Sequence, residues 1–259
     1  MKLEIRNATL GYNKKTILSK VDLSIETGEI VCILGKNGAG KTTLFRSILG
    51  SLHLLAGEIL IDGKRTDKMG IRTLANRIAY VPQARSLPFP FTVMDVVLFG
   101  RTPHLSFFSS PTKKDRIIAE DCLRKLHVLY LKDRIFTQLS GGEQQMVIVA
   151  RALAQQPSFI IMDEPTSNLD FGNQIRIISK INELRNESLG ILMATHSPDH
   201  AFMCKANVAV ISDGTLSKKG FCNQVITPEL LQNVYDTSVS VCCINEQSER
   251  KICVPHMAI

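Results

Sequence analysis

Residues Gly35–Thr43 read GKNGAGKTT and fit the pattern G-x-x-x-x-G-K-[ST] of a phosphate-binding P-loop. The run Ile30–Leu34 before them is short and apolar, which is typical of a buried strand, and Thr43–Leu49 after them has helical apolar spacing. The motif therefore lies in the context that it needs, between a strand and a helix. This order predicts an α/β fold with a P-loop NTPase (RecA-like) core.

The composition of the loop suits a nucleotide. Glycines, which lack Cβ, allow a tight turn and a close backbone approach, so that successive N–H groups and the N-terminus of the next helix face the phosphates. Lys41 would bring its charge to the β- and γ-phosphates, and the Thr42 hydroxyl can bind Mg²⁺. The predicted nucleotide-binding residues of the loop are Gly35, Asn37, Gly38, Ala39, Gly40, Lys41, Thr42 and Thr43.

Polar residues follow three other predicted strands. One fully apolar run ends in Asp163 and Glu164, and two adjacent carboxylates in such a place are costly unless they bind a cation or take part in chemistry. In a P-loop protein Asp163 is the natural acid on the Mg²⁺ side, and Glu164 can orient or deprotonate a water molecule. Gln83 and His196 each end a further strand, where ligand groups gather in α/β sheets.

The remaining sequence predicts the domain organisation. Alternating apolar and polar residues over 2–30 predict an N-terminal antiparallel β subdomain, and residues 89–156 predict a mostly helical insertion subdomain. We expect an ATPase domain over residues 1–224 and a C-terminal appendix, a short helix plus a hairpin, over residues 225–259.

Four phenylalanines of the insertion leave two alternatives open. They form either an exposed apolar surface that docks another protein or the insertion's own core. These residues are Phe89, Phe91, Phe107 and Phe108.

Bulk properties narrow the class of protein. The net charge of +7 is compatible with nucleic acid or an anionic membrane face, but the sequence has no block of five like charges and no basic–aromatic repeat, which argues against nucleic acid. No uncharged stretch reaches the roughly 18 residues of a membrane-spanning helix, and the charged N-terminus is unlike a signal peptide. We therefore expect a cytosolic protein. The seven scattered cysteines suggest neither a disulfide framework nor a zinc site.

Three motifs taken together resemble the nucleotide-binding subunits of ATP-binding cassette (ABC) transporters over essentially the whole chain. They are GKNGAGKTT, LSGGEQQ at Leu139–Gln145, and IIMDEP at Ile160–Pro165, followed by SNLD and His196. The resemblance implies an ATPase with ATP and Mg²⁺ as cofactors. It also implies a homodimer in which two chains sandwich two ATP molecules head to tail.

The resemblance also assigns roles to residues. Tyr12 would stack on adenine, Gln83 would couple Mg²⁺ and the attacking water to a membrane partner, and His196 would contact the γ-phosphate. The implied catalytic residues are Glu164, His196, Gln83 and Lys41, and the implied Mg²⁺ site consists of Thr42, Gln83 and Asp163. The residues implied to complete the ATP site of the opposing chain are Ser140, Gly141, Gly142, Glu143 and Asp170.

A finer resemblance is to importers of iron–siderophore complexes, haem and cobalamin, with relatives that handle molybdate or tungstate. It rests on VPQ at Val81–Gln83, on PFTVMDVVLFGRTPH at Pro90–His104, and on the C-terminal tail. It implies a peripheral subunit at the cytoplasmic face of the inner or plasma membrane. Its partners would be two polytopic permease subunits, contacted near Gln83–His104, and indirectly a substrate-binding protein, with no nucleic acid. The alternative is a soluble ABC ATPase of iron–sulfur assembly without a transporter.

Overall fold

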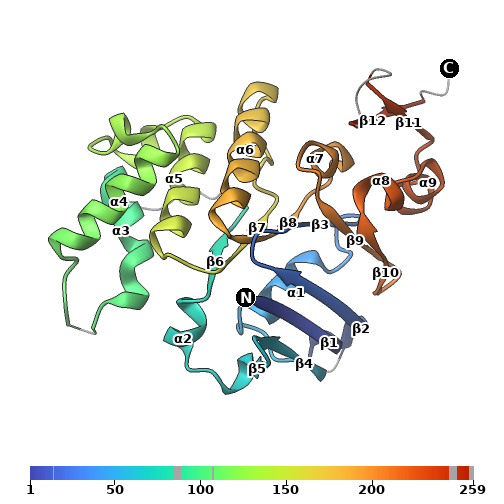
Figure 1. Cartoon of the computed structure of the whole chain (residues 1–259), viewed down its shortest axis with the longest axis horizontal. Coiled ribbons are helices and arrows are strands. Elements are labelled where there is room, and N and C mark those ends of the chain that lie inside the picture. Colours follow the sequence, from blue (N-terminus) through green and yellow to red (C-terminus); the bar gives the residue numbers. More distant parts are fainter. Residues whose placement is uncertain (14, 84–88, 107, 245–249, 257–259) are drawn as a thin grey trace.

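The computed structural model describes residues 1–256 except for 14, 84–88, 107 and 245–249 (Figure 1). Its central sheet has the strand order β10-β9-β3-β8-β7-β6, and every neighbouring pair except β9 and β10 is parallel. The carboxyl ends of β3, β6, β7 and β8 therefore meet at one edge of this sheet. The strands are β3 (Ile30–Leu34), β6 (Ile78–Val81), β7 (Phe159–Asp163), β8 (Gly190–Ala194), β9 (Asn207–Ser212) and β10 (Thr215–Phe221).

An antiparallel sheet with the order β2-β1-β4-β5 lies against one face of the central sheet. Strand β3 is apolar throughout because both of its faces are buried. Val31 and Ile33 pack with the antiparallel sheet and helix α1, whereas Cys32 and Leu34 pack with the helices of the other face. The strands are β1 (Lys2–Tyr12), β2 (Lys15–Glu26), β4 (Ala56–Ile61) and β5 (Lys64–Arg65), and α1 is Lys41–Ile48.

Helices α3, α4 and α5 form the group at the left of Figure 1, away from the antiparallel sheet. Each begins with a capping box, in which a Thr or Ser hydroxyl and an acidic side chain three residues later satisfy each other's backbone N–H groups. The helices are α2 (Ile71–Ala75), α3 (Val93–Leu98), α4 (Lys113–Lys125), α5 (Gly141–Ala154), α6 (Phe171–Leu184), α7 (Pro198–Met203), α8 (Cys222–Val225) and α9 (Pro228–Tyr235). Short 3-10 turns are η1 (Thr66–Lys68), η2 (Phe99–His104), η3 (Leu129–Leu131), η4 (Phe136–Gln138) and η5 (Arg185–Glu187).

The buried Arg101 connects the elements of this helical group through hydrogen bonds. The Arg101 guanidinium donates to Asp115 Oδ1 at 2.8 Å, to the Ala154 carbonyl at 2.7 Å and to Gln156 Oε1 at 2.9 Å. Hydrogen bonds from the Thr112 hydroxyl and from Arg101 hold the pKa of Asp115 well below its ordinary value. A buried charge needs such partners, so the contacts fix η2 against the start of α4 and the end of α5.

Of the four phenylalanines, the three that the structure describes divide between core packing and exposure. Phe91 packs against the core, with its ring 5.0 Å from that of Phe99, whereas Phe89 and Phe108 are exposed. Phe107 lies outside the described residues. In the part of the chain that the structure describes, no helix is both long and apolar enough to cross a membrane.

The C-terminal hairpin pairs β11 (Val239–Cys243) with β12 (Lys251–Pro255), and Val241 lies opposite Cys253. The C-terminal region from Asp236 onward contacts the P-loop and helix α7. Asp236, directly after α9, forms an ion pair with Lys36 of the P-loop. The backbone N–H of Cys253 donates to Asp199 Oδ1 of α7 at 2.9 Å.

Candidate functional site

The P-loop connects β3 to α1 at the carboxyl edge of the central sheet. Gly38 and Gly40 have φ values of 78° and 111°, which side-chain-bearing residues rarely adopt. A Cβ at Gly40 would also lie 2.9 Å from Cγ of Leu18. Glycine is therefore required there both by the backbone conformation and by the packing of the loop on β2.

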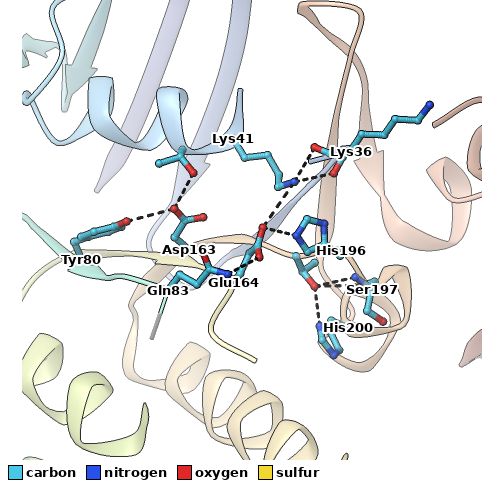
Figure 2. A network of polar contacts seen from close by, with 12 residues as sticks. Lys36, Lys41, Tyr80, Gln83, Asp163, Glu164, His196, Ser197 and His200 are labelled. Carbon is cyan, nitrogen blue, oxygen red and sulfur yellow. Dashed lines mark hydrogen bonds and ion pairs between the residues drawn. The ribbon is translucent and has the colours of Figure 1, made fainter. Parts of the chain in front are cut away.

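Lys41 begins α1 and is almost fully buried. Its Nζ donates to the carbonyl oxygens of Gly35 at 2.8 Å and Lys36 at 3.1 Å, and lies 3.9 Å from Glu164 Oε1 (Figure 2). Burial lowers the pKa of Lys41, and the carboxylates of Glu164 and Asp163 oppose that shift. The P-loop thus encloses a cation that faces the two acids at the end of β7.

The Glu164 carboxylate contacts side chains from three different loops. His196 Nε2 lies against Oε1, Lys41 approaches the same oxygen, and Gln83 Nε2 donates to Oε2 at 3.3 Å (Figure 2). The backbone of Glu164 has φ of 50°, a sparsely populated conformation for a residue with a side chain. A hydrogen bond of 3.2 Å from its N–H to the Ala194 carbonyl helps to fix this conformation.

Asp163 is only 6% exposed, and one of its carboxylate oxygens accepts hydrogen bonds from two hydroxyl groups. Thr42 Oγ1 donates to Oδ2 at 3.0 Å, and Tyr80 Oη donates to the same atom at 3.3 Å (Figure 2). Among the described residues, no side-chain cation lies within ion-pairing distance of Asp163. A buried carboxylate beside further oxygen atoms is what a hard cation such as Mg²⁺ requires, so these residues fit that ion.

The loop after β8 is held by a second pair of side chains. Thr195 Oγ1 lies 2.8 Å from Nδ1 of the buried His200 and accepts the Ser197 N–H at 3.1 Å (Figure 2). Burial lowers the pKa of His200. These contacts bracket His196 and orient it toward Glu164.

The remaining predicted residues form a separate group. Ser140 caps α5 by accepting the Glu143 N–H, and Asp170 caps α6 by accepting the Asn173 N–H at 2.8 Å. Asn173 in turn packs against Gly142. No hydrogen bond or ion pair between described residues joins Ser140, Glu143 or Asp170 to the group around Lys41 and Glu164.

Tyr12 lies apart from both groups, at the end of β1. Its hydroxyl accepts from Arg46 Nη1 of α1 at 3.2 Å, so the half-exposed ring stands beside the helix that follows the P-loop. The structure thus brings Lys41, Thr42, Gln83, Asp163, Glu164 and His196 together and leaves the LSGG segment outside.

Comparison with known proteins agrees with this geometry. Residues 18–167, more than half of the chain, match the family described as ABC transporter. The chain belongs to the ABC transporter family. ABC transporter ATP-binding proteins are ATPases, so this chain is an ABC ATPase.

Individual relatives cover nearly the full length of this ABC ATPase. An ABC transporter ATP-binding protein of Haemophilus influenzae, itself uncharacterised, is 40% identical over 92% of the chain and 90% of its own length. A probable iron chelatin transport ATP-binding protein of Helicobacter pylori is 35% identical over 92% and 94%. A solved metal-chelate-type ABC transporter in an inward-facing conformation is 28% identical, covers 98% of this chain and 97% of its own, and has a TM-score of 0.86.

Proposed function

We propose that two copies of this chain bind and hydrolyse ATP between them and so drive the import of a metal chelate through two polytopic membrane subunits. The chain would be a peripheral subunit at the cytoplasmic face of the membrane. The Helicobacter pylori relative is named for iron chelatin transport, and the solved neighbour is of metal-chelate type. Iron–siderophore complexes, haem and cobalamin are therefore the preferred cargo class, ahead of an oxyanion such as molybdate.

Hydrolysis follows from the position of Glu164. Its carboxylate polarises a water molecule for in-line attack on the γ-phosphorus, and Gln83 and His196 orient that carboxylate. Lys41 stabilises the charge that develops on the γ-phosphoryl group. Mg²⁺, when bound, neutralises phosphate charge, and Thr42, Gln83 and Asp163 would hold it through oxygen atoms.

The separate LSGG group supports a head-to-tail dimer. The first N–H groups of α5, at Gly141 and Gly142, need acceptors from outside the helix, and a helix N-terminus attracts phosphate. Since this N-terminus makes no polar contact with its own P-loop group among the described residues, we infer that it meets the γ-phosphate held by a second copy. Asp170 would cross the same interface.

A groove on the surface supports the proposal that this chain binds membrane subunits of a transporter. It has a volume of about 940 Å³ and lies between the segment around η1 and α2 and the end of α5. Exposed apolar side chains, Ile71 and Phe99, line it, as does Tyr80. A groove with exposed apolar side chains beside the ATP site suits a helical segment of a partner, which would then sense nucleotide through Gln83.

The alternative of an iron–sulfur assembly ATPase has no such support. The relatives described above are all named as ABC transporter or transport proteins. We therefore do not propose that function for this chain.

The groove gives a direct test. Ile71 is 88% exposed, and Ile71→Glu places a charge where an apolar partner segment would dock. We expect at least a roughly tenfold loss of the membrane subunits that co-purify with the chain, with unchanged ATP affinity.

The matched control is Ile117→Glu, because Ile117 is 60% exposed on α4 and does not line the groove. This variant should retain the membrane subunits. Equal recovery of those subunits with Ile71→Glu and with the wild type would exclude the groove as the docking surface. Recovery of a soluble scaffold in place of polytopic subunits would contradict the transporter proposal itself.

A further inference from the structure

Tyr80 lies between the metal side of the ATP site and the groove described above. It lies in β6, the strand beside β7, and its register partner there is Ile161. Its hydroxyl reaches Asp163 Oδ2, while its ring lines the groove and packs partly buried against the core beneath the antiparallel sheet. Figure 2 shows the Tyr80 hydroxyl directed at Asp163. The same rigid side chain therefore links the acid of the metal site to the groove.

The hydroxyl of Tyr80 shares its acceptor atom with Thr42. Both donate to Oδ2 of Asp163, at 3.3 Å and 3.0 Å respectively. When the Thr42 proton points at Asp163, the oxygen lone pairs of Thr42 are directed elsewhere and remain available to a cation. Because Tyr80 fixes where Oδ2 lies, it also fixes the direction in which Thr42 can offer its oxygen.

The ring of Tyr80 makes this arrangement sensitive to the groove. A tyrosine ring is rigid, so any displacement of the ring moves its hydroxyl as well. Because Tyr80 lines the groove, a segment that enters the groove can contact it. Contact at the groove can thereby alter the hydrogen bond to Asp163.

We propose that Tyr80 is a positioning residue that orients Asp163 for Mg²⁺ and transmits the occupancy of the groove to the metal side of the ATP site. The transmission, though not the orientation of Asp163, rests on the proposed docking of membrane subunits in that groove. A gain or loss of a hydrogen bond to a charged group changes an equilibrium by roughly tenfold or more, which is sufficient for such coupling.

The test compares affinities for ATP with MgCl₂ and for ATP with EDTA, measured by calorimetry on the full chain carrying Glu164→Gln to prevent hydrolysis. Tyr80→Phe removes the hydroxyl and keeps the ring. We expect it to reduce the preference for ATP with MgCl₂ by roughly tenfold and to leave the affinity for ATP with EDTA unchanged. An equal loss of both affinities would show a merely structural role and overturn the proposal.

A second comparison tests transmission with the chain assembled on its membrane subunits. In the wild-type tyrosine background, assembly should shift the preference for ATP with MgCl₂, and with Tyr80→Phe this shift should disappear. An identical shift in both backgrounds would refute transmission through Tyr80. If no membrane subunits bind the chain at all, the proposed function and the transmission both fail, whereas the MgCl₂ result on the isolated chain still decides whether Tyr80 orients Asp163.

Discussion

Glu164→Gln is expected to reduce ATP turnover by about 1,000-fold, within the range that a positioned general base contributes. The amide cannot accept a proton from the attacking water, but it has nearly the same shape as the carboxylate. Gln83 and His196 would still contact it, and the P-loop is untouched. ATP binding should therefore be preserved, and the chain should accumulate as an ATP-bound dimer.

Two measurements check this expectation. Steady-state phosphate release gives turnover, and size-exclusion chromatography with ATP and MgCl₂ gives the dimer fraction. Asp199→Asn provides a comparison, because this acid lies on α7, shortly after His196 in the sequence, and its carboxylate accepts the Cys253 N–H. It should retain most turnover. Near-normal hydrolysis by Glu164→Gln would remove Glu164 as the base.

Lys41→Ala is expected to weaken ATP binding by about 100-fold, the effect of losing charge-assisted hydrogen bonds to phosphate. The buried ammonium lies 3.9 Å from Glu164, and its replacement by a methyl group removes the positive charge from the buried site. The ATP phosphates would then face the carboxylates of Asp163 and Glu164 uncompensated.

The control for this prediction lies in the same loop. Lys36 is exposed and paired with Asp236, so its charge points away from the buried site, and Lys36→Ala should change ATP affinity only slightly. Equilibrium binding of a fluorescent ATP analogue, with circular dichroism to confirm folding, separates the two variants. Undiminished affinity in Lys41→Ala would count against the P-loop assignment.

The core of this site could be predicted because its residues have local signatures. The P-loop lies between a strand and a helix, and Asp163 and Glu164 end a fully apolar strand, so chain order alone brings them to one edge of the sheet. The structure places Gln83 and His196 there as well.

Other contacts had no such signature. Tyr80 and Asp163 are 83 positions apart, and Lys36 and Asp236 are 200 apart, so only tertiary packing brings each pair together. Tyr80 occupies one of the last positions of a strand, and that position could have marked it as a neighbour of the site. The amino-acid sequence alone, however, does not show which group its hydroxyl contacts. Phe91 packs against the core whereas Phe108 is exposed, and this difference likewise depends on how the helices pack.

We propose that each ATP site combines the P-loop of one copy with the LSGG segment of another. The most direct test of this shared site mixes two preparations of the chain, each carrying one inactivating change, Lys41→Ala or Ser140→Asp. Aspartate keeps the helix cap of α5 while its charge repels the γ-phosphate held by the opposing chain. In a mixed dimer, one ATP site combines the altered P-loop of one chain with the altered LSGG segment of the other and so contains both defects. The second site combines the two unaltered segments and is intact. We predict that mixing restores ATP turnover; a mixture that stays as inactive as either variant alone would contradict the shared site.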